Sequence, residues 1–180
     1  MYEQRLKSAL RQSGRLILIS GTAKQKKTVL CQKVIGKDSI IDVSGAQIQS
    51  QEDFWNQIEK KIRLQLEVQV TRTVANAAMD ISGPTDYEHD RGQNVAESSN
   101  SAIMGYLVAN NKVLVLDDFH YVENDLQIYI ARILKTELFN GLKAIVLSVP
   151  HRADDVIRHN PDLIGRITVI GRITVIEIAS

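Results

Sequence analysis

The chain has 180 residues, which suits one domain with a sizeable core and would be cramped for two. Lysine and arginine number 22 and aspartate and glutamate 21, so the formal charge of +1 gives no overall attraction to nucleic acid or to an anionic membrane. The single Cys31 excludes an internal disulfide, and no apolar run approaches the roughly 18–20 residues that cross a bilayer. We therefore expect one cytoplasmic domain, residues 1–180.

Apolar runs alternate with helical stretches along the chain, which is typical of a parallel sheet flanked by helices. Short apolar runs predict buried strands at 15–20, 39–43, 112–116 and 142–149. Helical patterns predict helices at 1–13, 27–35, 51–66, 95–110 and 123–139. The polar stretch 82–93 contains Gly and Pro and predicts a mobile loop.

The end of the sequence holds a tandem repeat. The hexamer GRITVI at 165–170 is followed at once by an identical copy at 171–176. Because six is even, a slip by one copy keeps every side chain on the same sheet face, so either copy suits the last strand. Two copies in series cannot share that position. A duplication without a role and a strand that pairs with another chain both remain open.

A candidate phosphate-binding loop follows the first strand. The segment GTAKQKKT at 21–28 comes after a buried strand and opens a helix, where backbone N–H groups bind phosphate oxygens. The candidate nucleotide-binding residues are Gly21, Thr22, Ala23, Lys24, Gln25, Lys26, Lys27 and Thr28. Lys27 is expected to reach the β- and γ-phosphates, and the Thr28 hydroxyl to bind Mg²⁺.

Lys26 stands where the pattern GxxxxGK[ST] has its second glycine. Its side chain either crowds the approach of the backbone to phosphate or adds a positive charge beside it. Lysines at a helix N-terminus are disfavoured by the helix dipole, and a bound polyphosphate would turn that cost into an attraction. The alternative is an ordinary basic surface loop.

Two carboxylates end the third predicted strand. Four apolar residues at 113–116 precede Asp117 and Asp118. In phosphoryl-transfer sites the first such acid orients Mg²⁺ or its water, and the next can polarise an attacking water. Alone, this pattern also fits a strand that ends in a solvated turn. Because it follows a candidate phosphate loop by about 90 residues, the two together favour a P-loop fold.

With these two motifs, the sequence resembles the AAA+/STAND group of additional-strand P-loop ATPases of bacterial signalling. The resemblance rests on RLILISGTAKQKKTVL, VLVLDDFHYV and AIVLSVPHR, and the order of elements extends it over nearly the whole chain. It implies an α/β fold, a three-layer sandwich with a mainly parallel five-stranded sheet. It also implies ATP and Mg²⁺ as cofactors and a slowly hydrolysing, nucleotide-dependent switch module of a larger signalling or defence ATPase.

The resemblance assigns roles to single residues. Asp117, with Thr28, matches the magnesium site, and Asp118 matches the catalytic acid, where many relatives carry glutamate. Ser148 and Arg152, at the end of the fourth strand, resemble a sensor of the γ-phosphate and join Lys27 in the catalytic set. Arg152 equally well anchors the following helix. His120 is expected to be structural, with a contact to the site as the alternative.

Such ATPases usually carry a helical lid or winged-helix domain after the fifth strand, so the resemblance implies that this domain is absent from residues 1–180. We expect a nucleotide as ligand, self-association or other domains of a longer parent as partners, and no membrane contact. Two alternatives remain open. One is a non-catalytic nucleotide-binding or interaction module with a degenerate phosphate loop. The other is a DNA-associated AAA+ module, against which the near-neutral charge counts.

Overall fold

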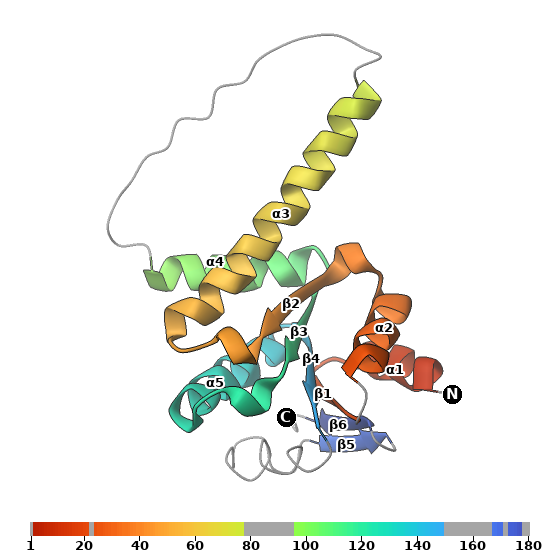
Figure 1. The fold of residues 1–180 in the computed structure, drawn as a ribbon, viewed down its shortest axis with the longest axis vertical. Coiled ribbons are helices and arrows are strands. Elements are labelled where there is room, and N and C mark those ends of the chain that lie inside the picture. Colours follow the sequence, from red (N-terminus) through yellow and green to blue (C-terminus); the bar gives the residue numbers. More distant parts are fainter. Residues whose placement is uncertain (1, 22–23, 78–95, 150–166, 171–172, 178–180) are drawn as a thin grey trace.

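The computed structural model describes residues 2–21, 24–77, 96–149, 167–170 and 173–177, and the side chains within 2–21, 26–73 and 99–149. Helices and strands alternate through most of these ranges (Figure 1). The helices are α1 (Tyr2–Leu10), α2 (Lys24–Ile35), α3 (Gln51–Ala77), α4 (Ala96–Ala109) and α5 (Asn124–Phe139). The strands are β1 (Arg15–Ser20), β2 (Ile40–Ser44), β3 (Val113–Asp117), β4 (Lys143–Ser148), β5 (Ile167–Ile170) and β6 (Ile173–Glu177). Single 3₁₀ turns are η1 (Lys37–Ser39), η2 (Gly45–Gln47) and η3 (Phe119–Tyr121).

The described strands form one sheet in the order β2-β3-β4-β1-β6-β5. Strands β2, β3, β4 and β1 run parallel, while β6 pairs antiparallel with β1 and β5 antiparallel with β6. The protein is therefore an α/β protein with a parallel sheet of four strands. Each of these four strands was predicted from its apolar run to within one residue at either end.

The sheet has six described strands, and the predicted number of five is wrong. The physical reason lies in the repeated hexamer, because both copies form strands. The second copy pairs with β1, and the first pairs with the second, with Ile167 opposite Ile176. The copies do not compete for one position, since an antiparallel hairpin places them in two neighbouring ones.

Helices cover both faces of the sheet, an arrangement compatible with a three-layer sandwich (Figure 1). Leu16 and Leu18 of β1 belong to a larger core shared with α3, α4 and α5. Ile17 and Ile19 belong to a smaller core shared with α1 and α2. Strands buried on both faces need apolar residues at consecutive positions, which is why their runs were recognisable in the sequence.

Three helices differ from their predicted bounds by three residues or more. Helix α1 ends at Leu10, three residues before the predicted end at residue 13. Helix α2 begins at Lys24, one turn earlier than predicted, and α3 continues to Ala77 instead of ending near residue 66. Beyond the sheet α3 projects from the body (Figure 1), and its apolar residues there are exposed, Val68 by 47% and Val70 by 61%. The predicted stripe fades at this point because no described core meets the helix. The predicted loop at 82–93 lies outside the described residues.

Helix α3 lies along the edge strand β2 and is attached to it by side chains that are spaced four residues apart. Gln57 accepts a hydrogen bond from the Ser44 N–H (2.9 Å) and donates one to the Ser44 carbonyl (3.2 Å). One turn further, Lys61 pairs with Asp42 at 2.5 Å. Another turn on, Gln65 donates to the Ile40 carbonyl at 2.8 Å. Four helical residues rise about 6 Å and two strand residues about 6.6 Å, so the two spacings match.

The turn η2, after β2, packs closely on the turn η3, after β3. A Cβ added at Gly45 would lie 2.5 Å from the Asp118 carbonyl oxygen and 3.0 Å from the Phe119 Cα. Asp118 itself adopts a left-handed conformation, with φ 54° and ψ 33°, which Asp and Asn tolerate better than most residues. Glycine at 45 therefore allows the carboxyl ends of β2 and β3 to approach each other.

We expect Gly45→Ala to lower the free energy of unfolding by about 1–3 kcal/mol, because the added methyl group meets backbone that cannot rotate away. The measurement is urea denaturation followed by circular dichroism. Gly105→Ala is the control, since a Cβ there meets nothing within 4 Å inside α4. It should stabilise the protein by up to about 1 kcal/mol. Equal stability of the two variants would contradict the close packing at Gly45.

Candidate nucleotide-binding site

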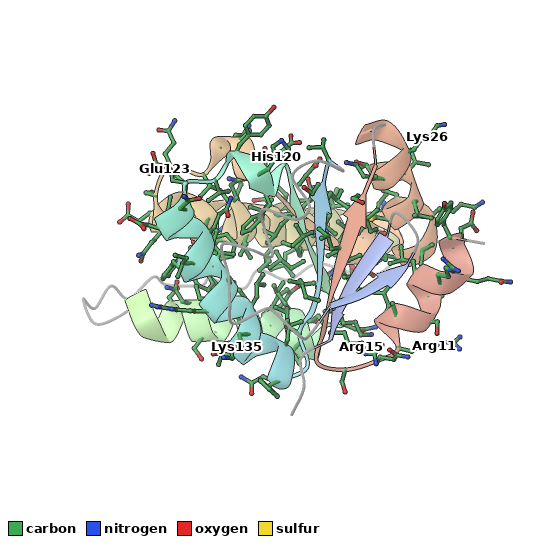
Figure 2. All side chains as sticks on the ribbon, turned by 90° about the horizontal axis from the view of Figure 1, so that it is seen from below. Arg11, Arg15, Lys26, His120, Glu123 and Lys135 are labelled. Atoms are coloured by element: carbon green, nitrogen blue, oxygen red, sulfur yellow. The ribbon has the colours of Figure 1, made fainter. Side chains whose placement is uncertain are left out.

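The carboxyl ends of the parallel strands meet at one edge of the sheet. Ser20 of β1 lies in register with Ser148 of β4, and Asp117 of β3 with Ser44 of β2. Lys26 and His120 lie at this end of the sheet, whereas Arg15 lies at the opposite end (Figure 2). In open α/β sheets ligands bind outside the carboxyl ends of the strands, and the predicted motifs converge on this edge.

Lys27 is buried at this edge, with only 7% of its surface exposed. Its ammonium donates to the Gly21 carbonyl at 3.0 Å and to the Ser148 carbonyl at 2.7 Å. Its aliphatic stem packs on Gly21, where an added Cβ would be 3.7 Å from the lysine Cδ. A buried ammonium needs such acceptors. Lys27 is thus held between the ends of β1 and β4.

The early start of α2 changes the shape of the predicted loop. With Lys24 already helical, the segment between β1 and α2 is Gly21 to residue 23, and residues 22–23 lie outside the description. Lysine at 26 favours helix over glycine by roughly 0.7–1 kcal/mol, which is a physical reason for the added turn. The first turn of a helix still offers backbone N–H donors and partial positive charge to an anion.

Lys26 itself is exposed and projects outward from the first turn of α2 (Figure 2). It is not among the residues that line the cavity described next. In the described conformation its side chain therefore does not crowd that cavity. The side chains of Lys24 and Gln25 lie outside the description, so only their helical backbone is placed.

A cavity of about 330 Å³ lies between α2 and the sheet. From the helix it is lined by Thr28, Cys31 and Gln32, and from the sheet by Ile40, Asp42, Val43, Ser44, Val115, Asp117 and Leu147, with Lys37 and Lys61 beside them. It joins two predicted site residues, Thr28 and Asp117. Two carboxylates and two ammonium groups give this cavity a mixed charge.

The predicted acidic pair is divided between two places. Asp117 lines the cavity, while Asp118 does not and occupies the left-handed position before η3. The Asp118 N–H donates to the Asp117 carboxylate at 2.8 Å, which fixes the orientation of that group. In the following turn, η3, Phe119 is buried in the larger core, and the His120 ring packs against the Tyr121 ring at 4.2 Å between centroids.

Of the two predicted sensor residues, only Ser148 is described. It is 1% exposed, its carbonyl accepts from Lys27, and its hydroxyl donates to the Val149 carbonyl at 3.4 Å. Arg152 lies outside the described residues, and its predicted role stays a prediction.

Sequence reasoning missed Asp42, Ser44 and Lys61 as cavity residues. The sequence did contain a signal for two of them, because Asp42 and Ser44 alternate with apolar residues in β2 and so share one sheet face. In register, that face also carries Val115 and Asp117 of β3. Lys61 had no such signal, since only the packing of α3 on β2 brings it to the cavity.

Thr28 and Asp117 fit a magnesium ion that arrives with a nucleotide. Mg²⁺ takes oxygen ligands and usually only one or two protein groups beside phosphate and water. A hydroxyl and a carboxylate on one cavity provide such a set. Within the described part of the chain, no group of three or more His, Cys, Asp or Glu residues could hold a metal by itself.

Comparisons with known proteins do not assign the chain to a family. A scan of the sequence against protein-family models gives no match, and a search of curated proteins gives none either. Within the described ranges, no helix combines the length and the apolar character that a membrane span requires.

Cys31 lines the cavity and is buried, with 1% of its surface exposed. Burial, and secondly the negative charge of Asp117, raises the pKa of the Cys31 thiol to about 12. The thiolate is the reactive form, so the folded protein should react slowly with thiol reagents at pH 8.

We expect labelling of the folded protein by iodoacetamide at pH 8 to be at least about 100-fold slower than labelling in 8 M urea, where the thiol pKa returns to about 8.5. Because the pKa of the Cys31 thiol is higher in the folded than in the unfolded protein, its contribution to stability is fully present below about pH 8.5. This contribution is lost as the pH rises from there toward 12. Mass spectrometry of the labelled protein measures the rates. Comparable rates in both states would contradict the buried environment.

Proposed function

We propose that this chain is a P-loop core that binds ATP with Mg²⁺ and acts as a nucleotide-dependent switch module. The observation that carries the proposal is the position of Lys27, buried between the ends of β1 and β4 beside the cavity that joins Thr28 and Asp117. In the sheet β4 lies between β1 and β3, which supports an additional-strand core.

Three side chains would hold the ligand. The Lys27 ammonium, now bound to two carbonyls, would exchange at least one of them for phosphate oxygens. The Thr28 hydroxyl and the Asp117 carboxylate would hold Mg²⁺, directly or through its water. When bound, the metal and the phosphates supply a polarised phosphoryl group, and the first turn of α2 adds its partial positive charge.

Hydrolysis on this core would be slow. Asp118 is the proposed general base, yet it does not line the cavity in the described conformation. Aspartate is also one methylene shorter than glutamate, so water activation requires η3 to shift toward the cavity. Ser148, with its hydroxyl near the end of β4, is the proposed contact to the γ-phosphate, together with Arg152. Slow turnover suits a switch, in which the bound state lasts.

The proposed setting is a larger, cytoplasmic signalling or defence ATPase in which this core associates with other copies or domains. The near-neutral charge supports a protein partner over a nucleic acid.

We expect Lys27→Met to weaken binding of ATP·Mg²⁺ by at least about tenfold, because a charge-assisted contact to phosphate is lost. Isothermal titration calorimetry measures the affinity, and circular dichroism verifies the fold. Lys33→Met is the matched control on the same helix. Lys33 pairs with Glu3 at the surface, so its loss should change the affinity less than about twofold. Unchanged affinity in Lys27→Met would contradict the proposed site.

The variant Lys26→Gly tests the proposal against the alternative of a degenerate phosphate loop. The exposed position of Lys26 supports binding by the unchanged protein. No heat of binding from that protein, followed by binding in Lys26→Gly, would instead favour a non-catalytic module whose loop has decayed.

Asp118→Asn tests catalysis separately from binding. Asparagine has the same shape and tolerates the left-handed backbone, so ATP should bind as before. Loss of the general base should lower steady-state phosphate release by about 100-fold. Full turnover in this variant would remove Asp118 from the mechanism and leave the binding proposal intact.

A further inference from the structure

The cavity has an outer wall that neither motif contains. We define this wall as Asp42 and Ser44 of β2 and Lys61 of α3. Lys61 reaches it because α3 is attached to the β2 edge on either side, by Gln57 one turn before and Gln65 one turn after. The Lys61 ammonium is therefore held over the cavity by helix packing, at 2.5 Å from the Asp42 carboxylate.

The wall lies close to the predicted metal residues. Asp117 is in register with Ser44, and Asp42 is two residues back on the same strand face. Two strand residues span about 6.6 Å and neighbouring strands lie about 4.8 Å apart, so the Asp42 and Asp117 Cα atoms are separated by about 8 Å. A lysine side chain spans most of such a distance. Lys37 also lines the cavity, but it precedes β2 and so lies toward the opposite end of the strand.

The position of the wall indicates which end of a nucleotide would approach it. A Mg²⁺ held by Thr28 and Asp117 would draw the terminal, γ-phosphate of a triphosphate to this end of the cavity. Thr28 lies on the α2 side of the cavity, and Asp117 on the sheet side toward β2. A triphosphate bound at Lys27 would extend its last phosphate past Thr28 into this cavity, toward Lys61.

We propose that Lys61 is a specificity residue that makes the site favour a nucleoside triphosphate over a diphosphate. This inference rests on the proposed nucleotide site. With a triphosphate present, the γ-phosphate competes with Asp42 for the Lys61 ammonium. A diphosphate leaves the Lys61–Asp42 pair intact. Asp42 opposes the preference, because it engages the ammonium and repels the incoming phosphate.

Two substitutions therefore have opposite effects. Lys61→Met keeps the side-chain stem and removes the charge, so it should weaken triphosphate binding and leave diphosphate binding nearly unchanged. Asp42→Asn releases the ammonium and removes a like charge, so it should strengthen triphosphate binding. Both groups are partly exposed, with 36% and 58% of their side chains accessible, which limits each effect to about three- to fivefold.

The experiment is calorimetric titration with Mg²⁺ and either the non-hydrolysable triphosphate analogue AMP-PNP or ADP. We expect the ratio of the two affinities to fall about three- to fivefold in Lys61→Met and to rise by a similar factor in Asp42→Asn. Lys60→Met is the charge control, since Lys60 is an exposed neighbour on α3 that does not line the cavity. This control should keep the original ratio.

The outcomes separate this inference from the function on which it rests. If neither nucleotide binds the unchanged protein, the nucleotide site and the inference both fail. If both bind and the ratio stays constant in Lys61→Met and Asp42→Asn, the site stands and the role of Lys61 is overturned. If Lys60→Met changes the ratio as much as Lys61→Met, the effect comes from the general charge of α3 and the proposed contact of Lys61 is also overturned.

Discussion

Parallel pairing of four strands is the constraint on which the rest of the structure depends. Because β1, β2, β3 and β4 run in one direction, their carboxyl ends share one edge, and residues far apart in the sequence, such as Ser20 and Ser148 or Ser44 and Asp117, become neighbours. The Lys27 ammonium joins two of these ends by donating to carbonyls that follow β1 and end β4. Close packing of Gly45 on the Asp118 backbone joins the other two. The candidate site is thus a product of the strand ends.

The edge strand β2 shows how a helix completes a sheet. An edge strand exposes backbone N–H and C=O groups that invite other chains, and proteins commonly cover them. Here Gln57 acts like a short piece of strand by donating to and accepting from the same residue, Ser44. Gln65 repeats half of this interaction at Ile40. The same attachment places Lys61 over the cavity, so one structural feature serves the stability of the edge and the charge of the proposed site.

Some features could be predicted because local chemistry decides them. The four parallel strands were recognisable since burial on both faces requires uninterrupted apolar residues, as in 113–116. Lys27 and Asp117 could be selected by their place after such runs. The start of α2 could not be predicted in this way, because lysine at position 26 favours the helix where glycine would favour a loop. The end of α3 was missed for a related reason: its final turns lack a core to face, so their apolar residues show no helical stripe.

The sequence by itself determined the class of fold, the apolar strands and the two motifs, because these follow from periodicity and from residue type at a strand end. Only the tertiary structure decided which residues meet. It separated Asp117 from Asp118 by the left-handed turn, put both repeat copies into a hairpin, and brought Lys61 to a cavity formed by α2 and β2. These outcomes depend on long-range packing, which no local pattern encodes. The predicted phosphate loop and the acidic strand end are therefore the part of the candidate site that the sequence reveals, and its third side, on α3, appears only when the chain is folded.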